Sequence, residues 1–377
     1  MVSRLLSYGI VVSLRTSQVI VFTLAVCASA WGADADLPAL TARLEQIINS
    51  SHGQVGVALA HVESGTKLSI HGEQRFPMAS VYKLPIAVEA LTQVSEGTLE
   101  MSRQVTLGPG DIRACCTLSR RYPRGGVTLM LGDLLELMMV ESDNSAADAV
   151  LKLVGGPAAV QRRLRERGFN AININRYDAQ ISLDMTGVRE AVTDAQWTLE
   201  LQRRLIAEVT PTDLHAARAR YTSDPRDTAT PDDMAALLVR LQRGDLLPWP
   251  YGEQLIERMS HAITGPRRLK ARLPPDTIVA HKTGTTDVVI NDVGIITLPE
   301  NRGHLVLAVF VMNGGPVSAM QTAIAEIAAA AYESFTGTQL PPPPPKVVKA
   351  ARKKRLPTKP LGGEGGRPAH RRKSVEK

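Results

Sequence analysis

The apolar residues of the chain begin with a helical period and then change to a strand-like pattern. A helix over 37–48 is predicted by residues that share one face: Leu37, Leu40, Leu44, Ile47 and Ile48. Two apolar runs follow, "QVGVALAHVES" and "KLSIHG", with Gly65 between them. A glycine between two such runs is typical of a turn, so the sequence predicts a strand hairpin directly after the first helix.

Helical periodicity dominates the middle of the chain, from Ser80 to about Arg258. Signals that cap or break helices lie at Thr128, Gly155 to Pro157, Pro231 and Pro248. Strand-like runs return in "TIVAHKTG", "DVGIITLP" and "LVLAVFVM", and an alanine-rich helix over 317–335 ends the pattern. Strands at both ends with helices between them predict an α/β fold, in which one sheet is built from both chain ends and a helical region is inserted.

Residues 1–33 have the layout of a secretory signal peptide. Arginines without any acidic residue precede the short apolar run "VIVFTLAVCASA", and small residues follow it, which predicts cleavage near Ala30 or Ala33. An uncleaved membrane anchor is the alternative. Lipid attachment at Cys27 is a second alternative, which the valine before this cysteine disfavours. We therefore expect a secreted or periplasmic protein.

Residues 337–377 differ in composition from the catalytic-domain candidate at 34–336. A run of prolines favours an extended spacer, and the basic segment after it has too few apolar residues to fold. The formal net charge of the whole chain is +7, and this positive charge belongs to the tail, so the folded part is acidic. Two interpretations stay open, contact of the tail with an anionic membrane or wall polymer, and a solvated tail with no dedicated partner.

The cysteines and histidines give no sign of a disulfide framework or a metal site. Cys27 leaves with the predicted signal peptide, and Cys115 and Cys116 are adjacent. A bond between neighbouring cysteines distorts the intervening peptide, so we expect two free thiols on a loop. The histidines show no H-x-H or H-E-x-x-H spacing, and the cysteines form no C-x-x-C pair, so we expect no zinc site.

The stretch "FPMASVYKLPIAVEAL" places Ser80 three residues ahead of Lys83 in an otherwise apolar segment. At this spacing the two side chains share a helix face, and a buried amine is costly to keep charged without a partner. Lys83 either has a partner elsewhere or takes the proton of Ser80. A lysine that extends from a core helix to solvent is the alternative for a single S-x-x-K.

Two more short motifs change this picture. "VESDNSAAD" holds Ser142, Asp143 and Asn144 ahead of a predicted helix, and "AHKTGTTD" holds Lys282, Thr283 and Gly284 on a predicted strand. S-x-x-K, S-D-N and K-T-G in this order are the signature of class A β-lactamases and penicillin-binding proteins. Over about 37–335 the sequence resembles a class A serine β-lactamase. The resemblance implies an antiparallel sheet flanked by helices, joined to an all-helical lobe, with the active site between them.

The resemblance also implies roles for the motif residues. Ser80 would attack a β-lactam and become acylated, with Lys83 as its proton partner, since a serine hydroxyl needs a base before it becomes a good nucleophile. Ser142 would pass a proton to the departing ring nitrogen. Asn144 would hydrogen-bond Lys83 and the substrate side-chain amide. No metal and no organic cofactor is implied.

Substrate binding is expected at the K-T-G strand. Lys282, Thr283 and Thr285 would hold the substrate carboxylate, and the backbone N–H groups of Ser80 and Thr285 would form the oxyanion hole. Arg268, in "TGPRRLKARLP", matches an arginine that supports this carboxylate in some relatives. The neighbouring Arg267 is the alternative for that position.

The loop that activates the hydrolytic water departs from the family pattern. In "INRYDAQISLD", Arg176 fits the loop's arginine, and Asp227 in "PRDTATP" fits the aspartate that pairs with it. The position of the family's glutamate holds Asp178, and that of its asparagine holds Ser182. Aspartate can act as a general base, but it is one methylene shorter, and a misplacement of about 1 Å can cost on the order of a hundredfold in rate.

The same loop is longer than in the family. Residues 183–225 have a helical pattern with a break at Pro211, so we expect a small helical insert near the mouth of the active site. Shaping of substrate access and a neutral surface insertion are both open. Asp184 or Glu190 could replace the missing glutamate, although nothing in the sequence favours them over Asp178. Cys115 and Cys116 lie at the position where many members of the family have an aromatic residue that lines the rim of the active-site cleft.

Two functions fit the sequence, and the water-activating loop separates them. The first is a secreted serine β-lactamase that works as a monomer on a β-lactam. The second is a penicillin-binding or D-Ala-D-Ala-peptidase-like protein, acting on β-lactams or peptidoglycan-like peptides, that is acylated and releases slowly because of Asp178. A relic domain with a binding tail is disfavoured because Ser80, Lys83, Ser142 and Lys282 are all present.

Overall fold

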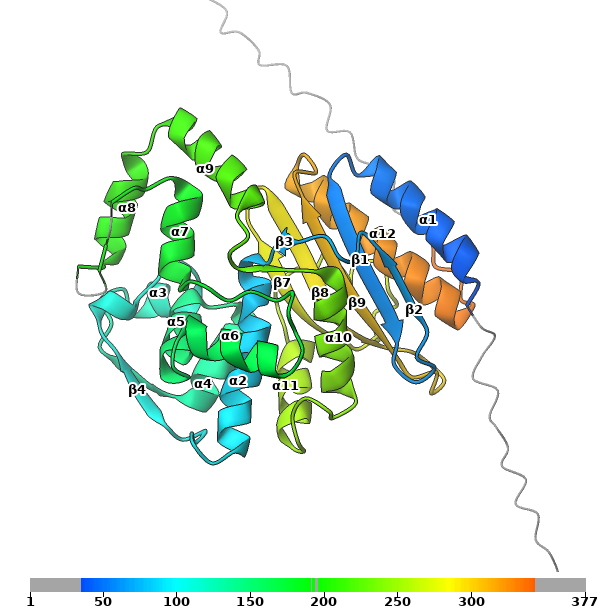
Figure 1. Ribbon diagram of the computed structural model, residues 1–377, viewed down its shortest axis with the longest axis horizontal. Helices are drawn as coiled ribbons and strands as arrows, with labels where there is room; N and C mark the ends of the chain where they lie inside the picture. Colours follow the sequence, from blue (N-terminus) through cyan, green and yellow to red (C-terminus); the bar gives the residue numbers. More distant parts are fainter. Residues whose placement is uncertain (1–34, 191, 194–195, 343–377) are drawn as a thin grey trace, which may run out of the picture. The chain divides into compact units, whose positions relative to one another are not determined.

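A computed structural model describes residues 35–190, 192–193 and 196–342. Its centre is a five-stranded antiparallel sheet in the order β2-β1-β9-β8-β7. The strands are β1 (Gln54–His61), β2 (Lys67–Ile70), β7 (Val279–Thr285), β8 (Val289–Thr297) and β9 (His304–Met312). β1 from the start of the chain pairs with β9 from its end, which confirms a sheet built from both chain ends (Figure 1).

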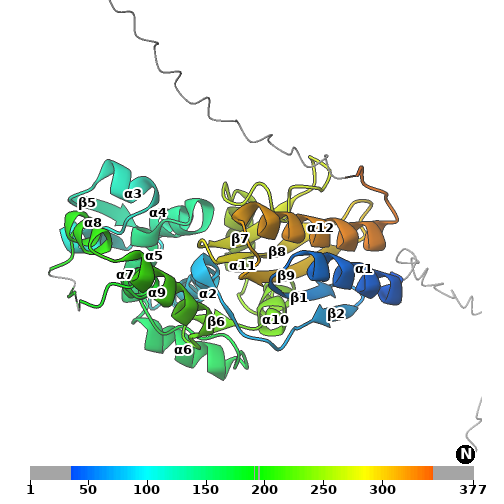
Figure 2. The same cartoon turned by 90° about the horizontal axis from the view of Figure 1, so that it is seen from above.

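Helices bury both faces of this sheet, which explains why the central strands are almost continuously apolar. α1 (Leu37–Ser50) and α12 (Val317–Thr336) lie side by side on one face, as Figure 2 shows. Their apolar sides pack against alternate residues of β8 and β9, such as Ile296 and Leu307. α10 (Pro231–Gln242) packs on the opposite face of the sheet. Val293 of β8 and Ala308 of β9 lie opposite each other in the sheet and belong to the apolar core on this face.

A lobe of helices lies beside the sheet (Figure 1). Its helices are α2 (Lys83–Ser95), α3 (Cys116–Arg121), α4 (Leu131–Glu136), α5 (Asn144–Leu153), α6 (Pro157–Glu166), α7 (Asp178–Thr186), α8 (Leu199–Ala207) and α9 (Pro211–Ser223). α11 (Tyr251–Ser260) packs mainly against β7 and also contacts α10. α2 is buried along almost its whole length. The antiparallel sheet flanked by helices and joined to a helical lobe agrees with the predicted fold class.

Three helix boundaries lie where the sequence signals predicted them. Pro157 and Pro231 are the first residues of α6 and α10, where proline's missing N–H costs no helical hydrogen bond. Pro248 lies between α10 and α11. Within 183–225, α9 begins at Pro211, the position of the expected break.

The cap predicted at Thr128 is wrong, because Thr128 lies in a strand. β4 (Gln104–Leu107) pairs with β5 (Val127–Met130) in a small hairpin, and Thr128 is opposite Thr106. β5 alternates between half-buried and exposed residues, and its β-branched Val127 and Thr128 favour a strand over a helix. α4 begins only at Leu131.

Four shorter features lie in or beside the predicted helical region. β3 (Phe76–Pro77) pairs with β6 (Thr228–Ala229), and Ser80 lies in a 3₁₀ turn, Ala79–Tyr82, so that α2 begins at Lys83 itself. A second 3₁₀ turn covers Pro109–Asp111, and a π-helical turn covers Leu137–Glu141. The strand pair β3–β6 and the turn after it join the sheet to the helical lobe.

The predicted signal peptide at 1–33, the lipidation alternative at Cys27 and the tail from residue 343 lie outside the described residues. Within the described part of the chain, no helix combines the length and the apolar character needed to cross a membrane.

Candidate active site

Lys83 is completely buried at the start of α2 and has polar partners on another loop. Its Nζ donates hydrogen bonds to the carbonyl oxygen of Ser142 at 2.5 Å and to Oδ1 of Asn144 at 2.5 Å, with Ser142 Oγ at 3.3 Å. Burial lowers the pKa of the Lys83 ammonium, and the nearby carboxylate of Asp178 opposes this effect. Lys83 is therefore a buried residue with hydrogen-bond partners, and its lowered pKa favours the neutral amine. The alternative of a lysine that extends to solvent is wrong.

The turn that carries Ser80 is held in place by the sheet. Ala79, directly before it, has a positive φ of 45°, which is uncommon for a residue other than glycine. The N–H of Met78 donates to the Asp227 carbonyl at 3.0 Å, and Asn291 Nδ2 donates to the carbonyls of Pro77 and Met78 at 2.8 and 3.0 Å. An unusual backbone conformation persists where surrounding contacts fix it, as they do here.

Gly284 of the K-T-G motif packs directly against the same turn. A Cβ atom at this position would come within 2.3 Å of the Met78 carbonyl oxygen. Only glycine allows β7 to approach so closely. The third residue of K-T-G therefore brings the strand of Lys282 against the turn of Ser80.

Ser142 has a left-handed backbone conformation (φ 64°, ψ 32°) between the π-helical turn and α5. Asp143 caps α5: its buried Oδ1 accepts hydrogen bonds from the N–H groups of Ser145 at 2.9 Å and Ala146 at 3.1 Å. A capping aspartate satisfies N–H groups that have no partner within the helix. S-D-N thus serves both as a helix cap and as the loop that presents Ser142 and Asn144 to Lys83.

A second buried lysine reaches Ser142 from the sheet. Lys282 Nζ donates to Ser142 Oγ at 2.8 Å and to the Thr283 carbonyl at 3.1 Å. Burial and the neighbouring Lys83 ammonium place the pKa of Lys282 well below its ordinary value. Thus Lys83 and Lys282, from the two sides of the site, approach the same hydroxyl.

Arg268, not Arg267, faces the K-T-G strand. It is buried and donates to the carbonyls of Gly284 at 3.0 Å and Asn291 at 2.7 Å, and to Thr285 Oγ1 at 2.6 Å, whereas Arg267 is exposed. Thr283 Oγ1 shares a 2.7 Å hydrogen bond with Thr264. The hydroxyls of Thr283 and Thr285 are therefore both oriented by hydrogen bonds, and such hydroxyls can donate to a carboxylate.

Asp178 is the first residue of α7, on the side of the site opposite β7. Its carboxyl group interacts electrostatically with Lys83, and burial raises its pKa to about 7, although the Lys83 charge opposes the rise. A carboxylate with this pKa is a candidate general base near neutral pH. Asp184 does not share this position, because it pairs with Arg176 and Arg226, and Glu190 is exposed.

Asp178 is anchored by Asp148, a residue that was not among the predicted site residues. The Asp148 carboxylate is buried and accepts hydrogen bonds from the backbone N–H groups of Asp178 at 2.6 Å and Ala179 at 3.3 Å. It also pairs with the buried Arg113 at 2.7 Å. Asp148 is the last residue of the stretch "VESDNSAAD". An acidic residue among the apolar residues of the helix after S-D-N could have indicated a buried carboxylate at this position.

Arg176 and Asp227 close the base of the Asp178 loop. Arg176 Nε donates to Asp227 at 2.6 Å, and its Nη1 contacts Asp184 at 2.6 Å and Asp224 at 3.2 Å. The other carboxylate oxygen of Asp227 accepts the N–H groups of Asn175 and Arg176 at 2.7 and 3.1 Å. The structure thus brings this pair together as the sequence predicted.

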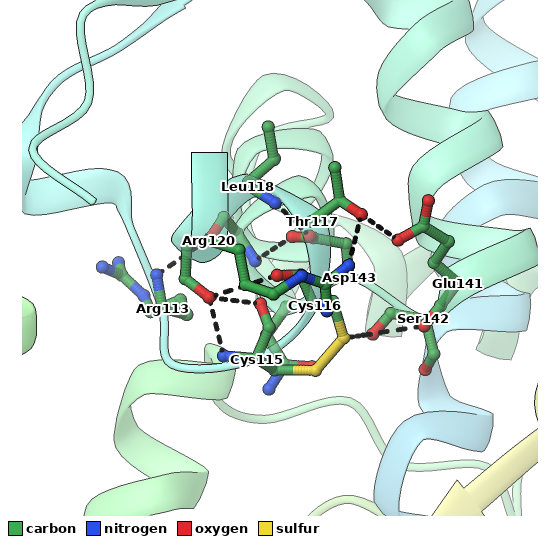
Figure 3. The surroundings of a disulfide bond; sticks show 12 residues. Arg113, Cys115, Cys116, Thr117, Leu118, Arg120, Glu141, Ser142 and Asp143 are labelled. Atoms are coloured by element: carbon green, nitrogen blue, oxygen red, sulfur yellow. Dashed lines mark hydrogen bonds between the residues drawn. A yellow bond between two sulfur atoms is a disulfide. The ribbon is translucent and has the colours of Figure 1, made fainter. Parts of the chain in front are cut away.

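The prediction that Cys115 and Cys116 are free thiols is wrong, since they form a disulfide at the rim of the site (Figure 3). Both residues have positive φ values, 147° and 69°, and this backbone brings the two sulfur atoms to the same side. Cys116 Sγ lies 3.6 Å from the Glu141 carbonyl oxygen and 3.9 Å from that of Ser142. No signal in the sequence indicated this backbone conformation.

Across 35–190, 192–193 and 196–342, no three His, Cys, Asp or Glu side chains form a group that could hold a metal ion. The side chains that meet here are a hydroxyl, two lysines and a carboxyl group. Such a set can activate a serine, stabilise a negatively charged substrate and activate a water molecule.

Comparisons with known proteins agree with this chemistry. A sequence model of the β-lactamase enzyme family matches residues 39–335. The β-lactamase VEB-1 of Pseudomonas aeruginosa is 30% identical over 290 residues, which cover 74% of this chain and 84% of the relative. The carbapenem-hydrolysing β-lactamase KPC of Klebsiella oxytoca is 29% identical, over 71% of this chain and 78% of the relative. An ancestral class A β-lactamase structure superposes with a TM-score of 0.64 at 29% identity, over 78% of this chain and 100% of that structure.

Proposed function

The chain belongs to the β-lactamase enzyme family, as a class A serine β-lactamase, and from this we propose that it opens β-lactam rings through an acyl-enzyme on Ser80. The observation that carries the proposal is the approach of Lys83 and Lys282 to Ser142 Oγ, at 3.3 and 2.8 Å, beside the turn of Ser80. Two buried amines and the hydroxyl between them form a proton path next to the nucleophile.

Acylation begins when the Ser80 hydroxyl attacks the carbonyl carbon of the β-lactam and transfers its proton to the base. Lys83 is suited to this role because burial lowers its pKa and so favours the neutral amine. The C–N bond of the ring then breaks, and Ser142 Oγ donates its proton to the departing nitrogen while Lys282 supports the hydroxyl. Lys83, which took the proton of Ser80, passes it to Ser142 Oγ across their 3.3 Å contact, so that Ser142 is again a hydroxyl and Lys83 again neutral. The backbone N–H groups of Ser80 and Thr285 stabilise the oxyanion.

Substrate binding uses the positive side of the site. Lys282, Thr283 and Thr285 hold the carboxylate of the substrate, and Arg268 orients Thr285 through its 2.6 Å hydrogen bond. Arg268 does so without contacting the substrate itself, because its guanidinium is engaged with two carbonyl groups of the sheet. Asn144, which binds Lys83 through Oδ1, has its amide N–H₂ available for the substrate side chain.

Deacylation requires a water molecule activated by a base, and Asp178 is the proposed base. Its raised pKa of about 7 matches a proton acceptor that works near neutral pH. Asp178 removes a proton from the water, the hydroxide attacks the acyl carbon, and the Ser80 oxygen leaves with a proton. The catalyst is then restored with the ring hydrolysed.

A second candidate function rests on the same residue. Asp178 is one methylene shorter than a glutamate, and Ser182 stands in place of the family's asparagine. If the shorter carboxylate holds the water poorly, the protein is acylated by β-lactams or by D-Ala-D-Ala peptides and releases them slowly. The two functions share the acylation machinery and differ only in the rate of release.

Steady-state hydrolysis of benzylpenicillin tests the proposal, with the Ser80→Ala and Lys83→Ala variants beside the parent. We expect turnover by the parent, none by Ser80→Ala and a fall of at least about a hundredfold for Lys83→Ala. Turnover that survives in Ser80→Ala would refute an acyl-enzyme on Ser80.

Localisation and partners complete the proposal. We propose that residues 1–33 are a cleaved signal peptide, that the mature protein acts as a secreted or periplasmic monomer, and that 337–377 is a basic tail with access to anionic membrane or wall polymer. The composition of these segments supports this. N-terminal sequencing of the exported protein tests the cleavage site near Ala30 or Ala33.

A further inference from the structure

The Cys115–Cys116 disulfide lies directly against the backbone of the proposed proton donor. Figure 3 shows Cys116 Sγ facing the carbonyl oxygen atoms of Glu141, at 3.6 Å, and Ser142, at 3.9 Å. The same Ser142 carbonyl accepts the 2.5 Å hydrogen bond from Lys83 Nζ. The disulfide therefore contacts a group that helps to place Ser142 beside Lys83, although none of the proposed steps uses it.

The two residues after the disulfide contact the same loop. The Thr117 hydroxyl donates to the carboxylate of Glu141, and the N–H of Leu118 donates to Asp143 Oδ2 at 2.9 Å. Asp143 is the buried cap of α5, so this contact reaches the start of that helix. Three successive residues at the start of α3 thus contact three successive residues around Ser142, and a shift of the first segment should shift the second.

The residue ahead of this segment is anchored by other contacts. Arg113 is buried, its N–H donates to Ser145 Oγ at 2.9 Å, and its guanidinium pairs with Asp148 at 2.7 Å. Asp148 in turn anchors Asp178. A change at the disulfide should therefore move the loop of Ser142 and leave the proposed base of deacylation in place.

The disulfide keeps an uncommon backbone conformation in place. The φ values of Cys115 and Cys116 are 147° and 69°, and residues other than glycine seldom adopt a positive φ. Such a conformation persists where other contacts enforce it, and the bond between the two side chains is a contact of this kind. Two sulfur atoms that are no longer bonded must separate, so reduction lets this backbone relax and shifts the start of α3.

We propose that this disulfide is a redox switch of acylation: the oxidised pair positions Ser142 to protonate the departing nitrogen, and reduction by a small thiol removes that positioning. Cys115 and Cys116 are thus positioning residues that act through Ser142. This inference rests on the proposed function, because it concerns the proton donor in the acylation of Ser80 by a β-lactam.

The switching step is an exchange between the disulfide and two molecules of a small thiol. Cys115 is exposed and Cys116 half-buried, so a thiolate attacks Cys115 Sγ. The bond between the two cysteine sulfur atoms breaks, and Cys116 leaves as a thiolate that takes a proton from water. A second thiol then displaces Cys115 from the mixed disulfide. Both cysteines end as thiols, and the two small thiols are oxidised to one disulfide molecule.

The test compares acylation rates of the oxidised and the reduced mature protein, followed by intact mass. After residue 33, Cys115 and Cys116 are the only cysteines of the sequence, so dithiothreitol has no other disulfide to reduce. The reagent is removed before the substrate is added. The Cys115→Ser/Cys116→Ser double variant gives a second state without the bond, and dithiothreitol treatment of this variant is the control for other effects of the reagent.

Benzylpenicillin and nitrocefin together distinguish a misplaced proton donor from general loosening of the site. The ring nitrogen of benzylpenicillin leaves as a saturated amine and needs a proton as its bond breaks. The nitrogen of nitrocefin is conjugated with an unsaturated side chain over which its charge spreads, so it needs the proton less. A misplaced Ser142 hydroxyl should therefore slow benzylpenicillin more than nitrocefin, whereas general loosening should slow both equally.

We expect reduction to slow acylation by benzylpenicillin about tenfold or more and acylation by nitrocefin about threefold or less. Reoxidation should restore both rates. The double variant should resemble the reduced protein and should not respond to dithiothreitol. Deacylation should stay within about twofold, because the Arg113–Asp148 pair that anchors Asp178 does not include the disulfide.

Unchanged rates after reduction, equal slowing of the two substrates, or a loss that reoxidation does not reverse would overturn the switch. A response of the double variant to dithiothreitol would do the same, since it would assign the effect to the reagent. If the double variant does not fold, the reduced parent decides the question alone. Failure of the oxidised protein to be acylated by either compound would instead overturn the proposed function.

Discussion

The backbone N–H of Asp178 donates a 2.6 Å hydrogen bond to the buried carboxylate of Asp148. This contact fixes the first residue of α7 against α5, and it also places a second negative charge near the Asp178 carboxyl group. That charge adds to the effect of burial in raising the Asp178 pKa. One residue thus determines both where the proposed base lies and at which pH it is ionised.

Replacing Asp148 should separate these two effects. Asp148→Asn keeps an acceptor for the Asp178 N–H but removes the charge, so the pKa of Asp178 should fall and the pH profile of deacylation should move to lower pH. Asp148→Ala also leaves Arg113 buried without its carboxylate, which should lower the free energy of unfolding by about 3 kcal/mol. Urea denaturation and pH–rate profiles measure the two outcomes. Equal stability of the Ala variant and the parent would contradict this role.

The pH dependence of the parent follows from the direction of the Asp178 shift. A raised pKa means that the carboxyl group keeps its proton up to about pH 7. Only the ionised form accepts a proton from water, so the deacylation rate should rise as the pH increases through about 7 and level off above it. Single-turnover decay of the acyl-enzyme measures this rate. A rate that falls over the same range would exclude Asp178 as the base.

The length of the Asp178 side chain is a second variable. Asp178→Asn should trap the acyl-enzyme, because an amide does not accept a proton from water. Asp178→Glu adds the missing methylene and should speed deacylation by about tenfold or more if reach limits the parent. Acylation rates should stay within about threefold in both variants, which serves as the internal control. A slower deacylation in Asp178→Glu would mean that the pocket is built for aspartate.

Gly284 gives a test of the nucleophile turn. Gly284→Ala places a Cβ within 2.3 Å of the Met78 carbonyl oxygen, so the turn of Ser80 must shift. We expect the acylation rate to fall by at least about a hundredfold. Gly132→Ala is the matched control, since its Cβ meets Met101 only at 3.5 Å, and its activity should be unchanged. A fully active Gly284→Ala variant would contradict the packing described.

The disulfide can be tested by peptide mass. The tryptic peptide over 114–120 contains both Cys115 and Cys116. Under alkylating conditions without reductant, it should have the mass of the cyclic, unalkylated form, lighter than the dithiol by two hydrogen atoms. Full alkylation at both residues without prior reduction would show free thiols and restore the original prediction.

Local patterns predicted much of the fold and the central site. The strands of the main sheet and the three motifs are short continuous stretches whose chemistry is visible in the sequence, as Ser80, Lys83 and Lys282 illustrate. The sequence did not predict features that depend on contacts between distant segments. Thr128 is in a strand because β5 pairs with β4, where Thr106 lies opposite it. Asp148 anchors Asp178 because its carboxylate accepts the N–H of the first residue of α7. Cys115 bonds to Cys116 because both residues have positive φ values. The contact of Cys116 with the Ser142 carbonyl also depends on distant segments, since the two residues lie on separate elements.

The central claim, that Ser80 is acylated and that Asp178 then releases the product, is tested most directly by intact mass over time. The mature protein is mixed with an excess of benzylpenicillin, beside Ser80→Ala. We predict that the ring-opened penicillin accumulates over many turnovers, with little acylated protein at any time and none in Ser80→Ala. A stoichiometric adduct that persists in the parent would contradict release by Asp178 and favour the penicillin-binding function. Absence of both the adduct and the ring-opened product would contradict acylation of Ser80 itself.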